Sequence, residues 1–189
     1  MDTSDSLIYR VATTSDCDSL SALINSSYCG ELSHQGWTNA DAIILPPRTS
    51  ADTLFNMIDS GKYVFLMFFG ENDQILKGCI HLLHEEGSKI AEIGMLSVRP
   101  DLQARGYGKF ILSIAENYAI NNWNVEYIEL NTIIGRHELT AYYIRRGYMD
   151  TGRRHLFPKE KMKFGTTQRE ELEVCTMSKR AKNEEKKTT

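Results

Sequence analysis

The chain has 189 residues, of which 41% are hydrophobic and 25% charged, a composition typical of one soluble globular domain with a sizeable core. Its formal net charge of −3 argues against nucleic acid as the main partner, because duplex binding usually requires a basic face. The longest apolar run, residues 63–69, has the length of a strand, so no membrane span is expected.

The cysteines and histidines do not have the spacing of a metal site. The four cysteines are widely spaced: Cys17, Cys29, Cys79 and Cys175. This spacing excludes a CxxC redox pair or a metal knuckle and indicates reduced thiols. His81 and His84 would face opposite sides of a strand, which makes them a poor metal pair. Because residues 1–6 are acidic and polar, unlike a secretory signal, we expect a cytoplasmic protein.

The first segments of the chain predict one strand and two helices. A short strand is expected over residues 8–11, and a capping box formed by Ser15 and Asp18 is expected to begin a helix. Residues 28–49 are rich in glycine, serine, asparagine and proline, and their length predicts that they are partly helical or functional. Ser50 is expected to cap a second helix, which Gly61 ends.

The middle of the chain predicts a meander of strands followed by a helix. Apolar runs at residues 63–69 and 75–83 are joined by a short polar segment, which indicates an antiparallel hairpin, and a third strand is expected at 90–98. After Gly108, apolar residues recur with helical spacing up to residue 119.

The last third predicts one more helix among three strands. A strand is expected at 127–130, a helix at 138–146, and strands near 148–151 and at 174–178. Residues 157–171 are expected to form a loop, and 179–189 a charged, disordered tail.

The order of elements indicates a fold class. It reads strand, helix, helix, three strands, helix, strand, helix and two strands, which predicts a mixed α/β sheet in a single domain over residues 1–178. The strand after the central crossover helix is expected to lie parallel to the strand before that helix.

The segment with the clearest chemical pattern lies between a strand and the central helix and reads Gln103-Ala104-Arg105-Gly106-Tyr107-Gly108. Unpartnered N–H groups and the dipole at a helix N-terminus make an anion site, and glycines let the backbone approach a phosphate. The segment lacks the third glycine of a Rossmann fingerprint and the Gly-Lys-Ser/Thr of a Walker loop. Spacing alone leaves open a phosphate site or a tight turn.

The segment resembles motif A of the GNAT superfamily of N-acetyltransferases, Gln/Arg-x-x-Gly-x-Gly/Ala. Residues 136–148 resemble motif B, which ends in Tyr-x-x-x-Gly-Phe/Tyr, with Tyr143 as its tyrosine. The likeness covers about residues 8–178 and implies the GNAT fold, a mixed sheet of six to seven strands flanked by about four helices. Residues 28–49 also resemble an uncharacterised bacterial and fungal subgroup of the superfamily.

The resemblance implies acetyl-CoA as the cofactor, with the pyrophosphate on residues 103–108 and the pantetheine arm along Ser97 and Val98. Arg136 stands where many members have an asparagine that contacts the coenzyme. The implied coenzyme-binding residues are Leu96, Ser97, Val98, Gln103, Ala104, Arg105, Gly106, Tyr107, Gly108, Lys109 and Arg136.

Acetyl transfer requires a neutral amine, a hydrogen bond to the developing oxyanion and a proton for the leaving thiolate. The resemblance places the oxyanion donor at the backbone N–H of Leu96, where the strand splays at a bulge. It places the acid at Tyr143. Glu92 stands in the register of the catalytic glutamate of the founding histone acetyltransferase, either as the base or as a residue that orders water.

The acceptor pocket is expected to be built by residues 28–49 and the last hairpin. Its substrate-binding candidates are Tyr28, Glu31, Trp37 and Arg48. Trp37 would wall the pocket or anchor the loop, and Glu31 is a second candidate base.

The expected function is therefore an N-acetyltransferase that acts on a primary amine of a small molecule or peptide by direct attack in a ternary complex. Two alternatives stay open: a non-catalytic acetyl-CoA sensor, and a transferase that uses another acyl-CoA. Because edge-strand pairing often gives dimers in this superfamily, a homodimer is also expected.

Overall fold

The computed structural model describes residues 6–40, 43, 46–157 and 172–181. Within these ranges the elements follow the expected order. They are β1 (Leu7–Val11), η1 (Thr14–Asp16), α1 (Cys17–Tyr28), η2 (Glu31–Gln35), α2 (Ala51–Asp59), β2 (Tyr63–Gly70), β3 (Leu76–His84), β4 (Ile90–Val98), η3 (Pro100–Leu102), α3 (Tyr107–Trp123), β5 (Tyr127–Ile133), α4 (His137–Ile144), β6 (Met149–Leu156) and β7 (Glu173–Arg180).

The strands form one seven-stranded sheet in the order β1-β2-β3-β4-β5-β7-β6. Neighbouring strands are antiparallel except β4 and β5, which pair in parallel across the crossover helix α3. The expected mixed sheet and its parallel pair are thus confirmed, since a helix between two strands of one sheet returns the chain in the same direction.

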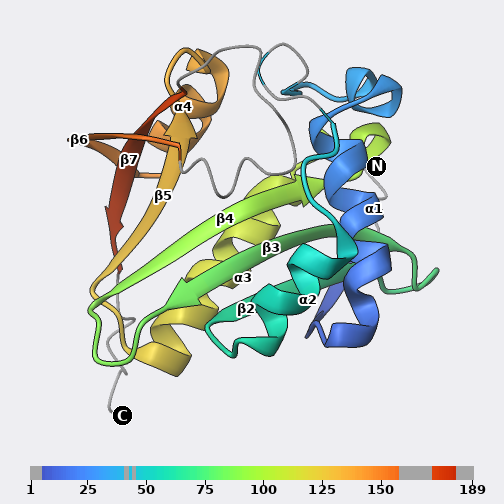
Figure 1. The fold of residues 1–189 in the computed structure, drawn as a ribbon, viewed down its shortest axis with the longest axis horizontal. Helices are drawn as coiled ribbons and strands as arrows, with labels where there is room; N and C mark the ends of the chain where they lie inside the picture. Colours follow the sequence, from blue (N-terminus) through green and yellow to red (C-terminus); the bar gives the residue numbers. More distant parts are fainter. Residues whose placement is uncertain (1–5, 41–42, 44–45, 158–171, 182–189) are drawn as a thin grey trace.

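Helices cover both faces of the sheet, with α1 and α2 on one face and α3 on the other (Figure 1). Along β2, Phe65 and Met67 pack with α1 and α2, whereas Leu66 and Phe68 pack with the α3 side. Because alternate side chains enter two different cores, β2 reads as a continuous apolar run rather than an alternating one.

The start of the first helix differs from the prediction. The backbone N–H of Thr13 donates to the Asp16 carboxylate at 2.8 Å, so the reciprocal cap lies two residues before the expected Ser15–Asp18 pair. Arg10 also donates to both oxygens of Asp16, at 2.8 and 2.7 Å, and holds this carboxylate in place. Ser50 does cap α2, as expected, by accepting a hydrogen bond from the Thr53 N–H.

The C-terminal elements also differ in extent. β6 runs to Leu156 rather than ending near residue 151, and α4 begins at His137 and ends at Ile144. β7 includes Lys179 and Arg180, the first two residues of the expected disordered tail, because they pair with β5 and Lys179 bonds to Glu116 at 2.6 Å. The rest of the tail, from residue 182, and residues 158–171 of the expected loop lie outside the described ranges.

The sheet opens between β4 and β5. These strands pair only from Ile90 to Glu92, opposite Tyr127 to Glu129, and beyond Glu92 they diverge while β5 continues to pair with β7. In Figure 1 the β5–β7 ribbon separates from β4 toward the end where α4 lies. This splay gives access to the edge of β4 in the middle of the molecule.

Several properties of the described part bear on its surroundings. All four cysteines are free and buried. In the described ranges no helix has the length and apolarity needed to cross a membrane.

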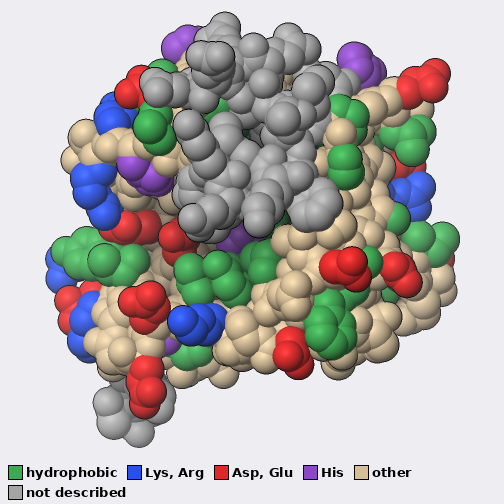
Figure 2. All heavy atoms as spheres, viewed as in Figure 1, with side chains coloured by type: hydrophobic (Ala, Val, Ile, Leu, Met, Phe, Trp, Pro, Cys, Tyr) green, Lys and Arg blue, Asp and Glu red, His purple; other side chains and the backbone are tan. Residues whose placement is uncertain are grey.

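Figure 2 shows acidic and basic side chains intermixed at the β6 edge of the sheet, where Arg154 pairs with Asp150 and Arg153 with Glu129.

Candidate active site

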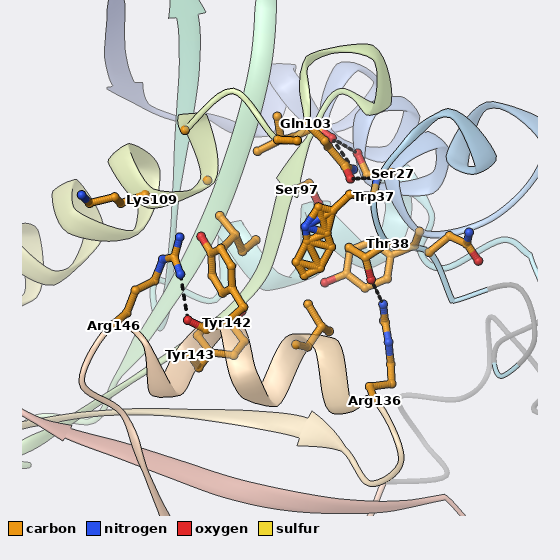
Figure 3. Close-up of a pocket in the computed structure, with 18 of the residues that line it drawn as sticks. Ser27, Trp37, Thr38, Ser97, Gln103, Lys109, Arg136, Tyr142, Tyr143 and Arg146 are labelled. Atoms are coloured by element: carbon orange, nitrogen blue, oxygen red, sulfur yellow. Dashed lines mark hydrogen bonds between the residues drawn. The ribbon is translucent and has the colours of Figure 1, made fainter.

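A cleft of about 420 Å³ lies where β4 and β5 diverge. Its walls are the end of β4, the loop before α3 with the first turn of that helix, helix α4, and residues from α1 and the segment 37–39 (Figure 3). Four basic residues line it and, among the described residues, no acidic one does: the basic residues are Lys109, Arg136, Arg145 and Arg146. A cleft with these linings suits a ligand that carries negative charge.

The loop before α3 presents unpartnered main-chain donors to this cleft. Gly106 has φ 89° and turns the chain into the helix, a left-handed conformation that glycine adopts without strain. From Ala104 to Lys109 no backbone N–H donates to a carbonyl in the described structure, and the first such bond is from Phe110 to Gly106. An ordinary helix start leaves about four free N–H groups, so this loop adds donors to those of the helix start.

The end of β4 carries a bulge on the side that pairs with β3. The register with β3 breaks between Cys79 and His81, and Met95 takes φ 48°. Met95 and Leu96 therefore fall outside the paired register. Leu96, Ser97 and Val98 line the cleft directly after this break.

Helix α4 supplies an aromatic wall. Tyr142 and Tyr143 both line the cleft, with their rings edge-on at 5.2 Å, and burial raises the pKa of each phenol. The Tyr142 hydroxyl is buried without a partner among the described atoms, close to Gly108, where an added Cβ would lie 3.0 Å from it. Arg146 stacks on the Tyr142 ring, 3.3 Å from its centroid.

Glu92 lies in a second cavity, also of about 420 Å³, at the root of the splay. Its neighbours there include Glu129, which is paired with Arg153 at 2.5 Å, and Asn131 on β5. In the described part of the chain the Glu92 carboxylate has no hydrogen-bond or ion-pair partner.

The structure brings together most of the residues singled out from sequence. Those that line the cleft are Tyr28, Trp37, Leu96, Ser97, Val98, Gln103, Ala104, Gly106, Gly108, Lys109, Arg136 and Tyr143. Arg105 is exposed and does not line it, and the Tyr107 side chain is in the core.

Two of the expected acceptor residues lie outside both cavities. Glu31 is exposed on η2. Arg48 stacks on Tyr28, with its guanidinium carbon 5.3 Å from the ring centroid, and on Phe157 at 5.8 Å. Arg48 thus supports the wall residue Tyr28 from behind and does not enter the cleft.

Sequence reasoning missed several cleft residues, chiefly Thr38, Leu139, Tyr142 and Arg146. For Tyr142 and Arg146 a signal existed, because residues three and four apart on a helix share a face, and Tyr142, Arg146 and Leu139 are spaced in this way. Thr38 had no such signal, since its segment has no regular period.

The comparisons with known proteins identify the family of the chain. The model of the Acetyltransferase (GNAT) family matches residues 35–148, more than half of the chain. No curated protein matches the chain.

Solved structures show the same fold at low identity. Spermidine N-acetyltransferase from Vibrio cholerae, in complex with CoA and spermine, is 17% identical with a TM-score of 0.66, covering 93% of this chain and 95% of its own. A putative phosphinothricin N-acetyltransferase is 16% identical with a TM-score of 0.65, at coverages of 94% and 100%. The putative acetyltransferase yncA from Salmonella typhimurium, with acetyl-CoA, is 16% identical with a TM-score of 0.64, at 94% and 95%.

Proposed function

Because this chain belongs to the GNAT family of acetyltransferases, we propose that it transfers the acetyl group of acetyl-CoA to a primary amine of a small molecule or peptide, by direct attack in a ternary complex. The observation that carries this proposal is the run of unpartnered backbone N–H groups at residues 104–109, beside the diverging edge of β4. The four free, buried cysteines are in keeping with a cytoplasmic protein.

The cleft fits the coenzyme by charge and by main-chain geometry. We assign the pyrophosphate to the N–H groups of residues 104–109, with Lys109 close by, and the pantetheine arm to the open edge at Ser97 and Val98. Bound acetyl-CoA supplies the acetyl group as a thioester. The other expected ligands, Gln103 and Arg136, also line the cleft, and their side chains are occupied by protein partners.

The roles of the reacting groups follow from their positions. The Leu96 N–H, beside the bulge, is the proposed donor to the thioester oxygen, where fixed donors stabilise developing negative charge. Tyr143 is the proposed acid, because its phenol lines the cleft and is protonated at neutral pH, as an unperturbed tyrosine already is.

Glu92 is the proposed acceptor-side carboxylate. It precedes Leu96 by four residues, which corresponds to about 13 Å along an extended strand. That separation supports the water-ordering role over direct proton abstraction. The second cavity then becomes the side from which the amine approaches, at the root of the same splay.

Substitution of Gly106 tests the coenzyme loop. Gly106→Ala places a side chain at φ 89°, which costs about 1–2 kcal/mol, and it displaces the N–H groups of the cradle. We expect at least a tenfold weaker affinity for CoA, measured by calorimetry. Gly61→Ala is the matched control. Gly61 also has a positive φ, of 68°, and a Cβ added there meets nothing within 4 Å. This glycine follows α2 and lies outside the cleft.

The two variants separate strain from binding. Both are expected to lower the melting temperature by similar amounts, whereas only Gly106→Ala weakens CoA. Equal CoA affinity in both variants would remove the loop from the coenzyme site. Tight CoA binding by the wild type without thiol release in the presence of any amine from a broad panel would instead favour a sensor.

A further inference from the structure

The segment Gly36–Thr38 crosses the cleft and is fixed to both of its walls. We call it the strap. It lies between η2 and α2 in sequence, in the part of the chain that has no regular period. In Figure 3 Trp37 projects into the cleft between Gln103 above and Arg136 below.

On the first wall the strap is held by Gln103 of the coenzyme loop. The Trp37 backbone N–H donates to Oε1 of Gln103 at 3.0 Å, and Nε2 of Gln103 donates to the Val98 carbonyl at 3.2 Å. The approach is so close that a Cβ added at Gly36 would lie 2.5 Å from the same Oε1. The Gln103 side chain is thus committed to protein contacts that join the strap to the end of β4.

On the second wall the strap is held by the start of α4. The Thr38 hydroxyl accepts a hydrogen bond from Nη2 of Arg136 and donates to Oε1 of Glu138 at 3.2 Å. Arg136 is 6% exposed, and its Nε donates to the same Glu138 oxygen at 3.0 Å. Burial opposes the ionised form of Glu138, but its own backbone N–H, Arg136 and Thr38 outweigh it and lower the pKa of Glu138.

Between these two attachments the indole of Trp37 is set against the aromatic wall. Its ring packs edge-on to Tyr142, with centroids 5.9 Å apart. The indole is still 40% exposed, so contact with Tyr142 covers only part of its surface. Packing alone therefore does not account for a fixed indole, and the polar attachments on either side are needed.

We propose that Thr38 is a positioning residue whose hydroxyl, clamped by Arg136 and Glu138, fixes Trp37 as a wall of the coenzyme cleft. This inference rests on the proposed function, since it takes the ligand of the cleft to be CoA. In this chain the motif B residue Arg136 then acts through the strap. Many family members have at this position an asparagine that contacts the coenzyme.

The test uses Trp37 as its own probe. The chain has two tryptophans, and the other, Trp123, stacks on His84 and does not line the cleft. In a Trp123→Phe background, acrylamide quenching of fluorescence reports the accessibility of Trp37 alone. CoA affinity is measured on the same proteins by calorimetry.

Thr38→Val removes the hydroxyl and keeps the shape of the side chain, whereas Thr38→Ser keeps the hydroxyl. We expect Thr38→Val to raise the quenching constant of Trp37 about twofold in the free protein and to weaken CoA about tenfold, as loss of a hydrogen bond to charged groups implies. Thr38→Ser should stay within twofold of the parent in both measurements.

Glu138→Ala is a second variant in case Thr38→Val does not fold. The Glu138 side chain is 47% exposed, so its removal leaves the core intact, yet it takes away the partner that Thr38 and Arg136 share. We expect the same two changes in this variant.

The outcomes separate this inference from the proposed function. If only the quenching or only the CoA affinity changes, or if neither does while CoA binds the parent protein, the positioning role of Thr38 is wrong and the enzyme assignment stands. If CoA does not bind the parent protein, the proposed function fails, and the inference fails with it.

Discussion

Tyr143 carries its phenolic proton at neutral pH, as an unperturbed tyrosine does, and burial, followed by the nearby Tyr28 and Tyr142, raises its pKa further. A phenol that stays protonated is suited to donate to a thiolate. We therefore expect Tyr143→Phe to lower kcat about a hundredfold, within the range of general acid catalysis, and to leave CoA affinity within twofold. The measurement is the initial rate of thiol release at saturating acetyl-CoA, with CoA affinity from calorimetry.

Tyr118→Phe is the control for that change, because Tyr118 lies on α3, packs edge-on to Trp123 and does not line the cleft. Its kcat should match the wild type. If Tyr143→Phe turned over at the wild-type rate, the acid would have to be sought elsewhere. The sequence could assign this tyrosine because its spacing to Gly147 is a motif, whereas Tyr142, beside it, has no motif position and had only its helical spacing to Leu139 and Arg146 as a signal.

At the scale of single elements, the turn η1, which leads directly into α1, depends on Asp16. Its carboxylate accepts hydrogen bonds from Arg10 and Thr13, and the Arg10 contact, followed by those of Thr13, holds the pKa of Asp16 well below its usual range despite partial burial. Asp16→Ala should lower the free energy of unfolding at pH 7 by about 1–2 kcal/mol, as loss of a cap does. Urea denaturation measures this difference.

The pH dependence follows from the sign of that shift. A carboxylate with a lowered folded-state pKa contributes fully above its unfolded-state pKa of about 3.9, and the contribution is lost as the pH falls toward the folded-state value. The difference in the free energy of unfolding between the wild type and Asp16→Ala should thus become smaller below about pH 4. Asp18→Ala, at the position expected from sequence to close the capping box, should have a much smaller effect. Equal effects of the two substitutions would contradict the observed cap.

Regular elements could be predicted from sequence and the strap could not. α1 has periodic apolar positions that identify a face, and the strands β2 to β4 are apolar runs of strand length. Residues 28–49 have none, so which of them reach the cleft depends on contacts with distant parts of the chain, such as Gly36 against Gln103. Hence Trp37 and Tyr28 reach the cleft, while Glu31 and Arg48, equally prominent in the sequence, do not.

At the scale of the whole molecule, Glu92 and the coenzyme loop line two different cavities. The coenzyme cleft lies where β4 and β5 diverge, and Glu92 lines the other cavity, at the last parallel pair between these strands. Motif spacing identified Glu92 by its distance in sequence from the coenzyme loop. It could not show that this carboxylate and the loop line different cavities, since that depends on where β5 leaves β4, a property of the folded sheet.

This separation predicts how Glu92→Gln affects the reaction. CoA affinity should be unchanged, because Glu92 does not line the cleft, whereas kcat/KM for the amine should fall at least tenfold at pH 7. An alkylamine loses its own proton near pH 10.4, so the need for help from the protein declines as the pH rises. The ratio of the wild-type kcat/KM to that of Glu92→Gln should therefore fall steadily between pH 7 and pH 9.5. A ratio of kcat/KM values that stays constant across this range would mean that Glu92 holds the amine in place and takes no part in removing its proton.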